Sequence, residues 1–230
     1  MTYEPQNRLL SALGAEGDID DAVVVELKAR QPLYEAGGVI KHVYFPLDAV
    51  VSIVADLGDG SVVEVATIGR EGMVGVGVAL RTTTSDHRAF IQVGGRALRL
   101  PAHRLLALMK SHDELDRIVH VYVQALMAQI ARSAACNRAH AVDERTARWL
   151  LMTHDRVGRD QFPLTQEFLG QMLGVARPRV STAAATLQRA GLIRYSRGRM
   201  EVLDRRGLEQ ASCECYRVIT DEYQRLLGDP

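Results

Sequence analysis

Apolar residues between positions 31 and 100 occur in short runs that alternate with polar residues or with glycine. Each run has the length of a β-strand, and the glycine-containing segments 37–38, 58–60 and 94–95 separate several of them as turns. The predicted strands are 42–45, 50–55, 62–68, 74–80, 89–93 and 97–100. Short strands at this spacing predict an all-β roll or barrel, which either holds one small ligand or is filled by its own side chains.

The sequence before this region predicts a short helical lead over residues 1 to about 30. Its packing positions are Leu9, Leu10, Leu13, Val23, Val24, Val25 and Leu27.

A long helix is predicted from Asp113 to about His140, because no glycine or proline interrupts this stretch. Apolar residues recur every three or four positions and also occupy the other sides of the helix. We therefore expect one side to pack on the barrel and another on a symmetry mate, although a helix buried within one subunit would give the same pattern. The residues expected at the dimer interface are Leu115, Val119, Tyr122, Leu126 and Ile130.

The C-terminal part predicts a helix over 141–156, a turn or short edge over 159–161, and a final helix over 207–227. Between them lies the pattern of a winged helix-turn-helix. Thr165 is placed to cap a short helix that Gly174 ends, and a second helix follows from about Arg177 to Ala190. Two short strands around the basic segment 196–199 predict a hairpin wing.

The charges in this segment support DNA binding. The whole chain balances 28 basic against 28 acidic side chains, whereas residues 163–203 carry six arginines and only two glutamates. A local excess of positive charge is what binding to phosphates requires. The alternative is a solvated helical hairpin with ordinary surface arginines.

Composition and length add the expected number of domains, the cellular location and the state of the cysteines. A chain of 230 residues that is 47% apolar predicts two globular domains. No apolar run is long enough to span a membrane and no signal pattern is present, so we expect a cytoplasmic protein. The chain has three cysteines, Cys136, Cys213 and Cys215. Because their number is odd and they lack the spacing of a zinc site, the sequence indicates neither a disulfide framework nor a metal. No cofactor is expected.

The order of β-roll, long helix and winged helix-turn-helix resembles the bacterial CRP/FNR family of transcription regulators over nearly the whole length. The match is carried by GQMLGVARPRVSTAAATLQRAGLI, by Asn137, Val142 and Arg145, and by the run Ala147-Arg148-Trp149-Leu150-Leu151. It implies an α+β protein with an N-terminal β-roll of jelly-roll type (1–112), a long dimerisation helix (113–140) and a C-terminal winged helix-turn-helix (141–230). It also implies a homodimer that binds double-stranded DNA at a palindromic operator, contacts RNA polymerase, responds to a small-molecule effector if it has one, and is not an enzyme.

The resemblance places Arg177 where the family's catabolite activator carries a guanine-reading arginine, whereas Pro178 and Thr182 replace two other base contacts. The expected base-reading residues are Arg177, Pro178, Arg179 and Thr182, and the expected phosphate contacts are Thr165, Ser181, Arg189, Arg197 and Arg199.

The effector pocket of the family would include Gly75, Val76, His87, Arg88 and Ile130. Val76 stands where cyclic nucleotide binding needs a glutamate, so a response to cyclic AMP is not expected. Two alternatives remain open. One is a cupin-like metal enzyme, although no His-x-His pattern occurs. The other is a regulator that needs no ligand.

Overall fold

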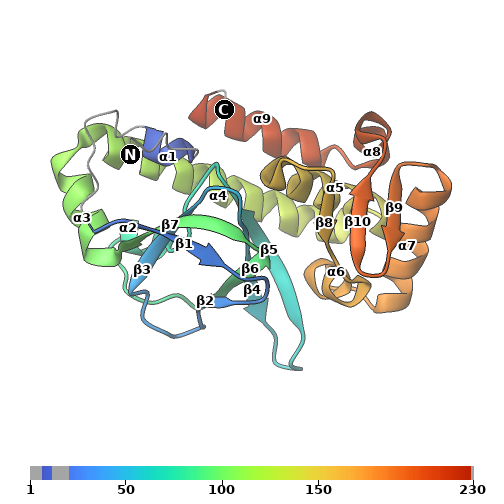
Figure 1. Ribbon diagram of the computed structural model, residues 1–230, viewed down its shortest axis with the longest axis horizontal. Helices are drawn as coiled ribbons and strands as arrows, with labels where there is room; N and C mark the ends of the chain where they lie inside the picture. The colour runs from blue at the N-terminus through green and yellow to red at the C-terminus, as the bar shows by residue number, and fades with distance from the viewer. Residues whose placement is uncertain (1–6, 12–20, 229–230) are drawn as a thin grey trace.

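The computed structural model describes residues 7–11 and 21–228, and its elements run from a β-roll through a long helix to a helix-turn-helix (Figure 1). The strands are β1 (Val23–Leu27), β2 (Pro32–Tyr34), β3 (His42–Pro46), β4 (Val50–Asp56), β5 (Val62–Ile68), β6 (Arg88–Val93), β7 (Gly95–Pro101), β8 (Gln161–Pro163), β9 (Ile193–Ser196) and β10 (Arg199–Val202). The helices are α1 (Arg8–Ser11), α2 (Val76–Ala79), α3 (Ala102–Ser111), α4 (Asp113–Ala139), α5 (Val142–Val157), α6 (Gln166–Leu173), α7 (Arg177–Arg189), α8 (Arg205–Ala211) and α9 (Cys215–Leu227). In the part of the chain described, no helix is both long and apolar enough to cross a membrane.

The predicted β-roll is formed by two antiparallel sheets, with strand orders β1-β7-β3 and β2-β6-β4-β5. Alternating apolar residues of both sheets, such as Phe45, Val51 and Ile91, are fully buried between them. Burial of these side chains is the main source of stability for the roll, because removal of apolar surface from water drives folding.

The later apolar positions of the predicted helical lead form a strand, which corrects that part of the prediction. Among the described residues of this lead, only Arg8–Ser11 is helical, and Leu13 lies outside the described residues. Val23–Leu27 pairs with β7 as strand β1. Three consecutive valines explain the difference, because β-branched side chains restrict the backbone to extended conformations and pack well in a sheet.

The strand predicted over 74–80 is also wrong. Val74 makes only an isolated bridge with Tyr44, and Val76–Ala79 forms the single-turn helix α2. Gly75 has a φ of 94°, a conformation that suits glycine and that turns the chain out of the sheet. The alternation of valine and glycine therefore imitates a strand without forming one.

The long helix α4 agrees with its predicted bounds, but its apolar stripe is not a dimer interface. Leu115, Val119, Tyr122 and Leu126 are 1%, 0%, 0% and 5% exposed, because they belong to the core of the single chain. Ile130, at 37% exposure, is the one predicted interface residue that remains available to a partner. The alternative reading, burial within one subunit, is correct for this stripe.

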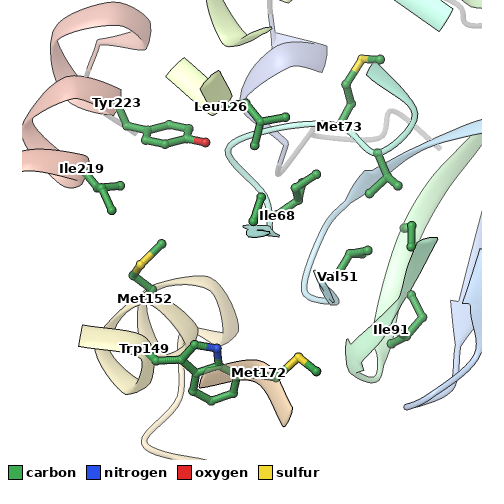
Figure 2. Packing of buried hydrophobic residues seen from close by; sticks show 14 of the residues in the cluster. Val51, Ile68, Met73, Ile91, Leu126, Trp149, Met152, Met172, Ile219 and Tyr223 are labelled. Atoms are coloured by element: carbon green, nitrogen blue, oxygen red, sulfur yellow. The ribbon is translucent and has the colours of Figure 1, made fainter. Parts of the chain in front are cut away.

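The final helix of the prediction is two helices. α8 ends at Ala211, Ser212 is extended, and α9 begins at Cys215 and packs against α4. Figure 2 shows Ile219 and Tyr223 of α9, Leu126 of α4 and Trp149 of α5 around one buried region with β-roll residues such as Ile68. The β-roll and the C-terminal part therefore share one continuous apolar core, and α4 runs through it.

Candidate nucleic-acid interface

The helix-turn-helix is built by local hydrogen bonds and two glycines. Thr165 Oγ1 accepts a hydrogen bond from the Phe168 amide at 3.1 Å and caps α6 as predicted. Gly174, with a φ of 62°, ends α6. A Cβ on Gly170 would lie 2.9 Å from the Val175 carbonyl oxygen, so glycine at this position lets the turn close against α6. Sequence analysis did not identify Gly170, because a glycine inside a helical pattern does not by itself reveal what approaches it.

The second helix, α7, presents the expected face to solvent. Val180, Ala183, Ala184 and Leu187 are each no more than 4% exposed and pack inward. The expected base-reading residues lie on the opposite side and its flanks, and all are exposed: Arg177, Pro178, Arg179 and Thr182. An α-helix with small and basic exposed residues is the element that a major groove accommodates.

The wing is a hairpin with a two-residue turn. β9 pairs with β10, and Ser196 lies opposite Arg199. Arg197 and Gly198 between them have φ values of 48° and 76°, the pattern of a type I′ turn, whose twist matches that of the strands. The turn places Arg197 and Arg199 at an exposed tip, and the hairpin borders a shallow hollow of about 280 Å³ lined also by Gln161 and Ser196.

The exposed arginines of this surface differ in their partners. Arg194 pairs with Glu201 at 2.8 Å, and Arg189 donates a hydrogen bond to Thr186. Among the described residues, the remaining four make no ion pair: Arg177, Arg179, Arg197 and Arg199. Together with Arg189, whose partner is a hydroxyl, they make five exposed cations without a carboxylate partner among the described residues, a surface suited to a polyanion.

Ser181 also has a partner within the protein. Its hydroxyl donates to Gln166 Oε1 at 2.7 Å and so ties α7 to α6. The Thr165 oxygen likewise serves as a helix cap. These bonds give both residues a structural role, and their contact with phosphate stays a prediction.

The residues expected to form the effector pocket contact different neighbours. A Cβ on Gly75 would lie 3.2 Å from Ile40 and Val43, and Val76 begins α2. Arg88 pairs with Asp56 at 2.8 Å and lies over the Phe90 ring.

The other two expected pocket residues have different surroundings again. His87 lies beside Asp86 at 2.6 Å, and Ile130 is on α4. Arg88, the basic residue among the expected pocket residues, therefore has a carboxylate partner, and the role of these residues in binding an effector stays a prediction.

A polar network that sequence analysis missed joins the β-roll to α5. Glu64 on β5 is 7% exposed, and its carboxylate accepts hydrogen bonds from Trp149 Nε1, Ser52 and Thr67. Burial raises the pKa of Glu64, and the three donors oppose that shift. Beside it lies a cavity of about 20 Å³, which has room for a water molecule and not for a nucleotide.

A second buried pair strengthens this junction. Arg156 of α5 binds Glu71 at 2.7 Å and donates to Gln129 of α4. The aromatic rings of Phe168 and Phe90 meet edge to face at 5.9 Å, so α6 also packs directly on the β-roll. The helix-turn-helix is therefore held against the β-roll by packing as well as by hydrogen bonds.

Two family models match the sequence. A cyclic nucleotide-binding domain matches residues 24–112, and a Crp-like helix-turn-helix domain matches residues 144–211. No curated protein matches the sequence significantly.

Solved structures with the same fold include several regulators. FixK2 from Bradyrhizobium japonicum has a TM-score of 0.71 at 15% identity, over 84% of this chain and 98% of that one. A CRP-family regulator from Thermus thermophilus has a TM-score of 0.68 at 21% identity, over 82% and 96%. A transcriptional regulator of the Crp/Fnr family from Eubacterium rectale has a TM-score of 0.66 at 16% identity, over 91% and 94%. At these identities the likeness shows the fold.

Proposed function

This chain belongs to the CRP/FNR family of bacterial transcription regulators and is a DNA-binding regulator of that type, and from this premise we propose that it binds a palindromic operator as a homodimer without responding to cyclic AMP. The family is non-enzymatic, which removes the cupin-like enzyme from consideration. The observation that carries the proposal is the exposed face of α7, where Arg177 and Arg179 make no ion pair with any residue that the structure describes.

Each part of the chain has its own role in this proposal. We propose a sensor unit over 1–112, a dimerisation helix over 113–140 and a DNA-binding unit over 141–230, with α7 in the major groove and the wing on the phosphates. Two copies related by a twofold axis would present their recognition helices about one DNA turn apart, which is why the operator is expected to be palindromic. Contact with RNA polymerase, and a small-molecule effector, stay predictions from the family.

Independence from cyclic AMP is supported by two features of the β-roll. Val76 offers no carboxylate to a ribose hydroxyl, and a buried hydroxyl without a partner costs about 1–3 kcal/mol. Arg88, the nearest basic candidate for the cyclic phosphate, is already paired with Asp56. A regulator that needs no ligand at all is the second candidate.

The test uses an operator obtained by selection from random duplexes, with affinity measured by fluorescence anisotropy. Arg177→Ala should weaken binding to the selected duplex by about 1–3 kcal/mol and relax its sequence preference, as loss of a bidentate base contact does. Arg197→Ala should weaken binding to all duplexes similarly and reduce the salt dependence. Cyclic AMP should leave the affinity unchanged.

Arg217→Ala is the matched control, because this arginine is exposed on α9, away from α7 and the wing. Equal loss of affinity in Arg217→Ala and Arg177→Ala, or binding without any sequence preference, would contradict the proposal. A large gain in affinity with cyclic AMP would contradict its second part.

A further inference from the structure

Three cysteines and one histidine meet at the joint between the long helix and the C-terminal unit. Cys136 and His140 lie one turn apart at the end of α4, Cys213 lies in the break between α8 and α9, and Cys215 is the first residue of α9. The three Sγ atoms and a histidine nitrogen all lie within 4.8 Å of one another. These are all the cysteines of the chain.

The break between α8 and α9 is what brings the cluster together. On a continuous helix, Cys213 and Cys215 would point to different sides. Here Cys213 precedes α9 and Cys215 is its first residue, so both thiols turn toward Cys136, which is 77 positions from Cys213 in the sequence. The local spacing of the cysteines therefore gave no sign of the cluster.

The distances fit a single tetrahedral ion. A zinc ion with Zn–S bonds of about 2.3 Å and a Zn–N bond of about 2.0 Å holds its ligand atoms about 3.5–3.8 Å apart. The Sγ atoms of Cys136 and Cys213 are 3.4 Å apart, and Cys215 Sγ is 3.7 Å from His140 Nδ1. Small movements would bring all four donors into the tetrahedron.

The second nitrogen of the histidine already has the partner that a metal ligand needs. His140 Nε2 lies 3.1 Å from the Glu214 carboxylate, which leaves Nδ1 directed at the thiols. A carboxylate on the far nitrogen fixes the tautomer and ring orientation of a metal-bound histidine. Glu214 stands between the two cysteines in the sequence, so the same short loop supplies two ligands and this support.

The surroundings favour an anionic centre. Cys136, Cys213 and Cys215 are 0%, 5% and 1% exposed, so thiolates here would be largely removed from water. Arg145 and Arg148 are buried at 6% and 5% exposure, and within the described part of the chain each has an Nε atom without a hydrogen-bond partner. A zinc ion with three thiolates and a neutral histidine carries one negative charge, which two buried guanidinium groups can balance.

We propose that Cys136, His140, Cys213 and Cys215 form a structural zinc site that fastens the end of α4 to the α8–α9 junction. Binding replaces the thiol protons by bonds to Zn²⁺ and releases those protons to solvent. The four protein ligands complete the tetrahedron and leave no open position, which is typical of a structural and not a catalytic site.

Two other uses of the cluster fit less well. An iron-sulfur cluster contains several irons, so ligands on different irons stand farther apart than the donors around one ion do. A disulfide between Cys136 and Cys213 would use two thiols and leave unexplained why Cys215, His140 and Glu214 converge on them.

The position of the site suggests what it does. α5 begins at Val142, two residues after His140, so the site lies where the chain passes from the long helix into the DNA-binding unit. A metal there fixes α9 along α4 and limits movement at this joint. Metal loss should therefore loosen the C-terminal unit before it unfolds the β-roll.

The test begins with untagged full-length protein purified under reducing conditions, with its metal measured by mass spectrometry. We expect one zinc per chain that resists dialysis. Replacement by Co²⁺ should give the intense visible absorption of a tetrahedral site with thiolate ligands. Stripping the metal with a chelator should lower the melting temperature by several degrees, and stoichiometric Zn²⁺ should restore it.

Variants assign the ligands. Cys215→Ala and His140→Ala should retain no zinc after dialysis, whereas His103→Ala, an exposed histidine on α3, should retain one equivalent. Glu214→Gln should weaken zinc binding about 10- to 100-fold in competition with a chromophoric chelator, as loss of a supporting partner does. Asp221→Asn, an exposed carboxylate on α9, is its matched control.

Three outcomes would overturn the proposal: reduced protein that binds neither Zn²⁺ nor Co²⁺, a Cys136–Cys213 disulfide in protein prepared without oxygen, or iron and sulfide in place of zinc. Because the wild-type metal content decides the matter, a ligand variant that fails to fold does not obscure it. None of these measurements involves DNA, so the result is separate from the proposed function.

Discussion

Gly72 lies against the ring of Tyr122, where the β-roll meets α4. A Cβ on Gly72 would stand 2.1 Å from the Tyr122 ring, closer than atoms can approach. The ring cannot move easily, because Tyr122 is fully buried and its hydroxyl donates to the Met73 carbonyl oxygen at 3.1 Å. A single hydrogen atom in place of a side chain therefore permits the helix to seat on the roll.

This contact gives a prediction at the scale of one residue. Gly72→Ala should lower the free energy of unfolding by about 1–3 kcal/mol, the usual cost of overpacking a core. Urea denaturation measures the change. Gly58→Ala is the control, because nothing lies within 4 Å of a Cβ added there. Equal stability of the two variants would show that the close approach has no energetic consequence.

At the scale of the element, α4 has two faces with different uses. Its predicted dimer stripe is covered by the rest of the chain, and α9 covers a further part. Met127 is 60% exposed and Ile130 is 37% exposed, and the small residues Ala131 and Ala134 are exposed along the same helix. If two copies associate through α4, this is the side that they must use, since the other sides are occupied.

We expect Met127→Arg to raise the dimer dissociation constant about tenfold or more, because a twofold interface would bury the new charge twice. Sedimentation velocity over a concentration series measures the constant. Leu57→Arg, at a residue 48% exposed beyond the end of β4, should leave it unchanged. An unaltered dimer in Met127→Arg would mean that the copies meet elsewhere.

At the scale of the whole molecule, the β-roll and the DNA-binding part are not independent bodies joined by a linker. Glu64 binds Trp149 across their junction, and Arg156 binds Glu71. The apolar core also continues from one part to the other (Figure 2). The β-roll is therefore in direct contact with α5 and α6. Such contacts let an effector influence DNA binding only if it prefers one arrangement of this junction.

The buried Glu64 predicts a dependence on pH. Burial raises its pKa in the folded chain above the ordinary value of 4.5, so its stabilising contribution is present below that value and is lost as pH rises through the folded pKa. The free energy of unfolding of the wild type, minus that of Glu64→Gln, should therefore fall as pH increases above about 4.5. Urea denaturation at several pH values measures it. Glu26→Gln, at an exposed glutamate, is the control variant.

Local patterns identified most elements because those elements depend on neighbouring residues. Thr165 and Gly174 delimit α6, the small and apolar residues of α7 fall on one face, and the bounds of α4 follow from the lack of glycine and proline. Three predictions were wrong: the helix at the valines of β1, the strand after Val74 and the single helix through the break before α9. Pairing partners and chain direction decide the structure of those segments.

What the sequence by itself determined is the family, the order of the elements and the exposed basic face of α7, since periodicity, caps and local charge act over a few residues. Only the tertiary structure decided which side of α4 is free, that Glu64 meets Trp149, and that Cys136 meets Cys213 and Cys215. These contacts join residues far apart in the chain, and no local spacing records them, because they arise only when separate elements pack together.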